Sequence, residues 1–206
     1  MPTALTLTLA LTGASGAALT RTLLDQLEQD ERVEHVDLVA SPHGLRVARE
    51  ELDLSEGTLE QLPQRLLGRE APKVQVHDNR DIGANIASGS YPSVGMIVAP
   101  CSMGTCAAIT HGLADTLIER AADVCLKERR KLLLVVRESP LNLVHLRNLL
   151  AAHEAGATIY PLTPAFYDRA ETIGAMLLQF AARLLEQAGL PQSTAFQWQG
   201  SERRLV

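Results

Sequence analysis

Short apolar runs alternate along this chain with longer stretches in which apolar residues recur every three or four positions. The first pattern is typical of buried strands, and the second is typical of amphipathic helices. The apolar runs predict strands at 4–11, 35–40, 74–76, 94–99, 132–136 and 158–161. The helical stretches predict helices that end near residues 29, 51, 111, 129, 154 and 188. Strands that alternate with helices indicate an open, mostly parallel α/β sheet with helices on both faces.

The segments between these elements are polar. Residues 52–69 are punctuated by glycine and proline and are expected to form a surface excursion, and 83–93 a loop rich in Gly, Ser and Asn. From about residue 192 the chain is a polar tail, apart from Phe196, Trp198 and its end. Residues 1–206 are therefore expected to form a single domain.

Three helix starts carry local signals. Asp115 is expected to cap the helix that ends near 129, and Pro140 to open the helix at 141–154. The last helix is expected to begin at Glu171.

Composition narrows the class of protein. The net charge is −5 and aromatic residues make up 3%, which argues against a nucleic-acid binder. The three cysteines have no CxxC spacing and the histidines no HxH or HExxH spacing, so neither disulfides nor a metal site are expected. No signal peptide and no membrane span of about 18 apolar residues is recognised, so we expect a cytoplasmic protein.

Two turns of small residues follow strands. The first, residues 13–16, delivers backbone N–H groups to a helix start, which suits an anion, and Ser15 either adds a hydroxyl or serves as the helix cap. A dinucleotide site would place an acid near the end of the second strand, but that strand ends at Ser41. A mononucleotide such as FMN is therefore favoured over NAD.

The second turn, residues 99–105, repeats the arrangement on another strand. Ser102 and Thr105 offer hydroxyl groups, and Gly104 permits close approach of a ligand to the backbone. Cys101 is interpreted as a buried small thiol rather than a nucleophile, since no partner histidine is indicated by spacing.

The strand at 132–136 ends directly in Arg137 and Glu138. Ligands of open α/β sheets bind at the carboxyl ends of the strands. The two side chains form either an ion pair at a strand end or an acid/base carboxylate beside a cation.

Two further groups have both a structural and a functional interpretation. Arg120, Asp123 and Lys127 share one helix face, either as solvated salt bridges or as a cationic surface over a phosphate. Tyr160, Phe166 and Tyr167 follow the last strand, either as loop packing or as the wall of an apolar pocket.

With these residues assembled, the chain resembles the UbiX-type flavin prenyltransferases, within the wider family of flavin-containing cysteine decarboxylase-like flavoproteins. The matching segments are Ser41, TGASGA (12–17), GMIVAPCSMGTCAAITHG (95–112), RAADVCLKERRKLLLVVRESPLNLVHLRNL (120–149) and PAFY (164–167). After PAFY, residues 168–174 lack the proline that the family commonly shows.

The resemblance implies a flavodoxin-like Rossmann fold that binds reduced FMN. It implies metal-independent transfer of a dimethylallyl group from dimethylallyl monophosphate to N5 and C6 of the flavin. The product, prenylated FMN, would serve UbiD-type decarboxylases. A homo-dodecamer with sites at subunit junctions is also implied.

Site residues carry over by position. The implied FMN contacts are Gly13, Ala14, Ser15, Ser41, Ser102, Met103, Gly104, Thr105 and Arg137. The implied ligands of the prenyl phosphate are Arg120, Lys127, Tyr167 and Arg183. Glu138 would be the acid/base group, relayed through Ser15, and either Glu50 or Glu51 would enter a site from another subunit.

Two rival functions remain open on the sequence. One is an FMN-dependent decarboxylase of a cysteine-containing peptide or pantothenate conjugate, for which His43 is the only nearby histidine. The other is a carrier that passes FMN to a decarboxylase unaltered. The phosphate clamp is the feature that separates prenyl transfer from both.

Overall fold

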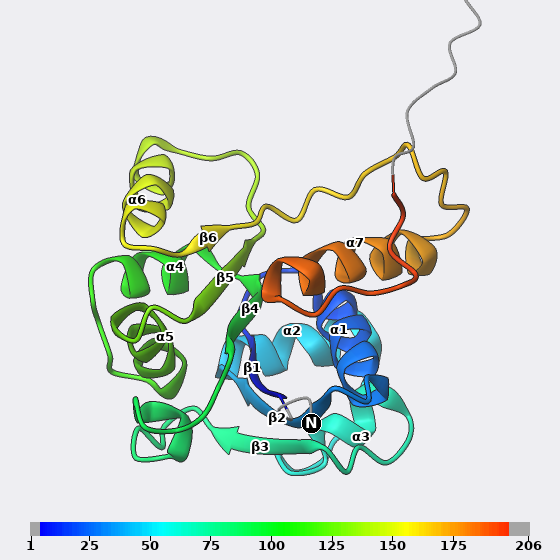
Figure 1. Cartoon of the computed structure of the whole chain (residues 1–206), viewed down its shortest axis with the longest axis horizontal. Coiled ribbons are helices and arrows are strands. Elements are labelled where there is room, and N and C mark those ends of the chain that lie inside the picture. Colours follow the sequence, from blue (N-terminus) through cyan, green and yellow to red (C-terminus); the bar gives the residue numbers. More distant parts are fainter. Residues whose placement is uncertain (1–4, 198–206) are drawn as a thin grey trace, which may run out of the picture.

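The computed structural model describes residues 5–197, and the predicted tail residue Trp198 lies outside them. A six-stranded sheet runs through the middle of the molecule (Figure 1). Its strands are β1 (Leu5–Leu11), β2 (Val33–Ala40), β3 (Val74–Asp78), β4 (Gly95–Cys101), β5 (Lys131–Val136) and β6 (Thr158–Ile159). All neighbours pair in parallel in the order β3-β2-β1-β4-β5-β6, so the predicted open, Rossmann-like sheet is confirmed.

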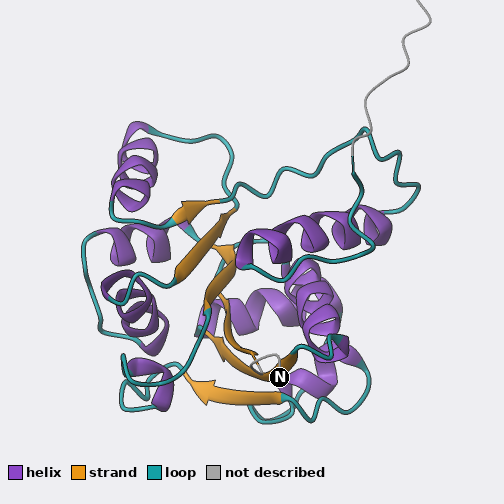
Figure 2. Ribbon diagram, viewed as in Figure 1, coloured by secondary structure: helices purple, strands orange, loops and turns teal. Residues whose placement is uncertain are grey.

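Helices cover both faces of the sheet, as Figure 2 shows. The helices are α1 (Ala17–Gln29), α2 (Pro42–Leu52), α3 (Leu62–Leu67), α4 (Met103–Thr110), α5 (Leu117–Lys127), α6 (Leu143–Glu154) and α7 (Ile173–Ala188), with a short 3₁₀ turn η1 (Asn85–Ala87). One core lies under α1, α2, α3 and α7, and the other lies under α4, α5 and α6.

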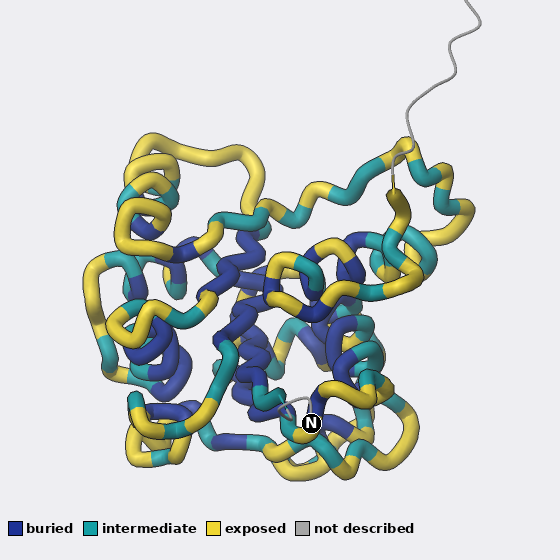
Figure 3. The backbone as a smooth tube through the Cα atoms, in the orientation of Figure 1, coloured by how far each residue is buried: buried dark blue, intermediate teal, exposed yellow. Residues whose placement is uncertain are grey.

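The continuous apolar strands contribute side chains to both cores. In β4, Ile97 and Ala99 belong to the core under α1 and α7, whereas Met96 and Val98 belong to the opposite core. All four residues have a relative exposure of 0%. Successive side chains of a strand point to opposite faces, so a sheet covered on both sides needs such a run. The buried centre and exposed rim are visible in Figure 3.

Several element boundaries differ from the predictions. Thr116 rather than Asp115 caps α5, because Glu119 completes a capping box with Thr116. Asn142 caps α6, so Pro140 precedes the cap instead of opening the helix. Thr172 caps α7, so Glu171 lies before the helix. The excursion at 52–69 contains the unpredicted helix α3, and β6 has only two residues.

Among residues 5–197, no helix has the length and apolar character needed to cross a bilayer. Nor does that part of the chain gather three or more His, Cys, Asp or Glu side chains in a cluster that could hold a metal ion.

Candidate active site

The two predicted turns follow β1 and β4, which are neighbours at the centre of the sheet. The chain crosses from one side of β1 to the other at this point, and such a switch point is where open α/β sheets bind ligands. Thr12, which is fully buried, ties the two turns together. Its hydroxyl donates to the carbonyl of Pro100 and accepts from the N–H of Ser102, both at 2.8 Å. Thr12 is not among the predicted site residues, although its position at the end of a predicted strand was visible in the sequence.

The first turn is occupied by a carboxylate from the same chain. The N–H groups of Gly16 and Ala17 donate to Glu51 at 2.9 and 2.8 Å. Gly16 is the cap of α1, with φ of 126°, so the interpretation of Ser15 as the cap is wrong. Glu50 instead pairs with Arg46 at 2.8 Å on the exposed side of α2. Of the two candidate acids, the structure therefore brings Glu51 to this turn, within one chain.

Glu51 is held in its charged form. Burial alone would raise the pKa of its carboxyl, but hydrogen bonds from Ser15 and from the N–H groups of Gly16 and Ala17, with the charge of Arg137, lower that pKa below its ordinary value. The positive end of the α1 dipole acts in the same direction. The turn predicted to receive an external anion therefore has an internal one.

Arg137 and Glu138 have different partners. The guanidinium Nε of Arg137 donates to the carbonyl of Ser15 at 3.3 Å and joins the end of β5 to the first turn. The Glu138 carboxylate is exposed and accepts the N–H of Ser139 at 3.0 Å. The pair is thus better described as one positioned cation and one separate carboxylate.

The second turn is a capped helix start. The Ser102 hydroxyl oxygen accepts the N–H of Thr105 at 3.2 Å and lies 3.0 Å from the Thr105 hydroxyl. Gly104 is exposed, whereas Met103 is buried in the core under α4, α5 and α6. Cys101 is fully buried and burial raises the pKa of its thiol well above the ordinary value, consistent with a structural thiol.

The remaining small residues surround the first turn. Gly13 and Ser15 are exposed and Ala14 is buried. Ser41 caps α2 by accepting the N–H of Gly44 at 3.0 Å. At Gly13 a Cβ atom would lie 2.6 Å from the Cβ of His43, so the start of α2 packs tightly on this turn.

Tyr167 and Arg183 line one hollow of about 320 Å³ beside β6 and α7. The floor is aromatic, because Tyr160 and Phe180 meet edge to face with ring centroids 5.2 Å apart. The loop after β6 connects this hollow to the first turn. Pro161 and Thr163 line the hollow, and between them Leu162 packs on Gly16, where a Cβ atom would lie 2.9 Å from its side chain.

Arg120 and Lys127 lie on α5, across the sheet from α7. Arg120 pairs with Asp123 at 2.6 Å, as the structural interpretation expected, and Lys127 pairs with Glu128. Lys127 is next to Gly89, in the loop that leads into β4, whereas the candidate site follows the other end of that strand. A strand of seven residues spans about 20 Å. Within one chain, the four implied phosphate ligands are therefore not brought together.

Comparison with known proteins gives the family. The profile of the Flavoprotein family matches residues 2–177. The flavin prenyltransferase UbiX of Pseudomonas aeruginosa is 40% identical over 204 residues, covering 97% of this chain and 96% of that protein. The chain belongs to the UbiX flavin prenyltransferase family. The resemblance seen in the sequence is thereby confirmed.

Solved structures of UbiX proteins share the fold. AnUbiX (PadA1), in complex with FMN and dimethylallyl pyrophosphate, matches with a TM-score of 0.84 at 39% identity, covering 96% of this chain and 99% of that one. A dodecameric FMN-dependent UbiX-like decarboxylase from Escherichia coli O157:H7 matches with a TM-score of 0.83 at 40% identity, covering 95% and 100%. Membership of the family favours prenyl transfer over decarboxylation of a cysteine-containing compound.

Proposed function

We propose that this protein joins the five-carbon group of dimethylallyl monophosphate to N5 and C6 of reduced FMN. The observation that carries the proposal is the adjacency of two features, a ligand-binding switch point and a hollow lined by Arg183 and Tyr167, joined through Leu162. The UbiX protein with FMN and dimethylallyl pyrophosphate bound has the same fold over nearly the whole chain, which supports this assignment.

The residues of the switch point fit FMN. Gly104 is exposed, and of the atoms beyond its neighbours only the Ser102 hydroxyl comes within 4.0 Å of the Cβ position, so a ligand can approach the backbone there. Arg137 is fixed against the first turn by its bond to Ser15. When bound, reduced FMN supplies the nucleophilic atoms for the new bonds.

The protein's own groups handle charge and protons. Cleavage of the allylic C–O bond leaves negative charge on the phosphate, which the Arg183 guanidinium and the Tyr167 hydroxyl stabilise. Glu138, the exposed carboxylate that follows Arg137 in the chain, accepts or returns the proton that moves during bond formation, with Ser15 as relay. Glu51 keeps a negative charge at the turn, and this charge attracts Arg137.

The assembly completes the cationic site. Helix α6 presents large apolar side chains that are 51–60% exposed, namely Leu143, Val144, Leu146 and Leu150. Such a face marks a protein interface, and a UbiX-like relative is dodecameric. We propose that this chain forms a homo-dodecamer in which Arg120 and Lys127 of one copy approach the hollow of another. Substitution Leu150→Glu should lower the mass measured by light scattering, and an unchanged mass would exclude this face.

We also propose the destination of the product and its compartment. Prenylated FMN would pass to a UbiD-type decarboxylase, the partner that the resemblance to the UbiX family implies. The three buried cysteines are all free thiols, as expected for the reducing cytoplasm.

One experiment tests the activity. Purified protein, reduced FMN and dimethylallyl monophosphate are mixed without oxygen, and the flavin is weighed by mass spectrometry. The expected result is a mass increase of one five-carbon group, with inorganic phosphate released in equal amount. Unmodified FMN that is nonetheless retained by the protein would favour the carrier function instead. Parallel reactions with the pyrophosphate decide which leaving group is preferred.

A further inference from the structure

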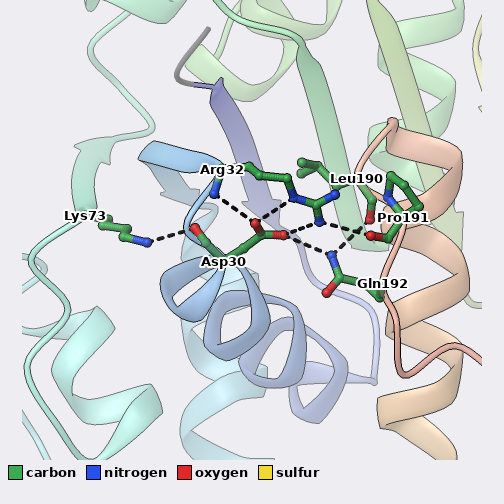
Figure 4. A network of polar contacts seen from close by, with 6 residues as sticks. All are labelled: Asp30, Arg32, Lys73, Leu190, Pro191 and Gln192. Carbon is green, nitrogen blue, oxygen red and sulfur yellow. Dashed lines mark hydrogen bonds and ion pairs between the residues drawn. The ribbon is translucent and has the colours of Figure 1, made fainter. Parts of the chain in front are cut away.

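The segment after α7 turns back along that helix, as Figure 1 shows. Its beginning is held by a polar network (Figure 4). Arg32 bonds Asp30 at 2.5 Å and the carbonyl of Pro191 at 3.0 Å, and the amide of Gln192 donates to Asp30 at 3.1 Å. The backbone carbonyl of Asp30 also accepts a hydrogen bond from the Lys73 ammonium at 2.9 Å. Residues 190–192 are therefore fixed to the end of α1 and the start of β2.

A single side chain in the middle of α7 holds the rest of the segment. The amide nitrogen of Gln179 donates to the carbonyl of Thr194 at 3.1 Å, and its amide oxygen accepts the N–H of Phe196 at 2.8 Å. One side chain thus satisfies an acceptor and a donor two residues apart, as a neighbouring strand would. This contact holds residues 194 and 196, and between them the Ala195 N–H donates to the carbonyl of Gln192 at 3.1 Å.

The result is that Phe196 becomes a wall of the hollow. Its ring centroid lies 5.3 Å from that of Tyr167, and both rings line the hollow that Arg183 also lines. Phe196 is partly exposed, at 36%, and it lies at this wall because the segment after α7 turns back. Among the described residues, the Phe196 N–H has no hydrogen-bond acceptor other than Gln179.

We propose that Gln179 is a positioning residue that holds Phe196 as the wall limiting the length of the prenyl group, an inference that rests on the proposed function. Arg183 and Tyr167 hold the phosphate end, so the apolar end of the substrate must fit between the aromatic floor and Phe196. A five-carbon group fits a short apolar space, whereas a ten-carbon group needs this wall to move. Phe196, which does not bind the phosphate, then sets the length of the prenyl group that the site accepts.

The positioning is tested without substrate. Hydrogen exchange of the peptide covering 190–197 is compared in the wild type, Gln179→Leu and the control Gln187→Leu, an exposed glutamine on the same helix. We expect the Phe196 amide to exchange about five- to ten-fold faster in Gln179→Leu and at the wild-type rate in the control. Equal exchange in all three proteins would overturn the positioning role, whether or not the protein transfers prenyl groups.

Specificity is tested with dimethylallyl and geranyl monophosphates. Gln179→Leu and Phe196→Ala should each raise the KM for dimethylallyl monophosphate several-fold, leave the Kd for FMN unchanged, and increase kcat/KM for the geranyl substrate relative to the dimethylallyl one. Phe196→Leu, which keeps apolar bulk, should fall between the wild type and Phe196→Ala. An unchanged ratio of the two substrates in both variants would overturn the specificity role. If the wild type transfers neither group, the proposed function fails, and the exchange measurement still decides the positioning.

Discussion

Thr12→Val should uncouple the two turns of the candidate site. Valine has nearly the shape of threonine, so the substitution removes one hydroxyl and leaves the fully buried position filled. The Ser102 N–H loses its bond to Thr12 Oγ1, whereas the Pro100 carbonyl keeps the bond from the Thr12 backbone N–H at 3.3 Å. An unsatisfied buried donor costs about 1–3 kcal/mol and a lost hydrogen bond about 1 kcal/mol, so we expect a loss of roughly 2–4 kcal/mol.

Two other threonines give matched controls for this substitution. Thr20 is also fully buried, and its hydroxyl donates to the carbonyl of Ala99 at 2.6 Å, so Thr20→Val should cost about 1–2 kcal/mol. Thr22 is partly exposed and bonds only to the carbonyl of Ala18 at 2.9 Å, one turn back, so Thr22→Val should change stability by less than about 0.5 kcal/mol. The three variants make the same chemical change at different depths.

Urea unfolding of the three variants, followed by circular dichroism, measures the free energies. For a domain of this size, the loss at Thr12 corresponds to a fall in Tm of about 4–16 °C. FMN titration separates the effect on stability from the effect on the site. Thr12→Val should weaken FMN binding about five-fold or more, whereas Thr20→Val should leave it unchanged. The reasoning is refuted if Thr12→Val is as stable as Thr22→Val, or if it is destabilised with unaltered FMN affinity.

Three further predictions concern charged groups. Glu138→Gln should bind FMN normally but form the prenylated product more slowly in a stopped-flow assay, and unchanged turnover would contradict its acid/base role. Arg183→Ala should raise the KM for dimethylallyl monophosphate far more than the Kd for FMN, and an effect on FMN alone would contradict the phosphate clamp. The hydrogen bond from Arg32 holds the pKa of Asp30 well below its usual range, so this group stabilises the fold above about pH 4, the ordinary value, and the contribution disappears as pH falls through the folded-state pKa. The free energies of unfolding from urea titrations should therefore differ by about 1 kcal/mol between the wild type and Asp30→Asn at pH 6, and the difference should narrow in acid. A gap that does not vary with pH would contradict this assignment.

The sheet could be predicted from the sequence because its strands are buried on both faces. The run 132–136 can be recognised as a strand from its own residues alone, because every one of them is apolar. Every one of them is buried in the structure. The boundaries of helices were less predictable because two adjacent residues can each cap. Asp115 and Thr116 both have suitable side chains, and Glu119 decides between them by completing a capping box. That pattern was present in the sequence and could have been recognised.

The contacts that shape the site were beyond the reach of sequence reasoning because they join residues that are distant along the chain. Glu51 reaches a turn 35 residues earlier, and nothing in the local sequence distinguishes it from Glu50, which lies on the exposed side of the same helix. The distinction comes from packing, since α2 rests on α1 and turns one acid inward. This has a functional consequence. The Glu51 carboxylate already accepts the N–H groups of Gly16 and Ala17, so a phosphate would have to displace Glu51 to bind them. We therefore expect the phosphate groups of the ligands to bind at the second turn, at the start of α2 or in the hollow lined by Arg183.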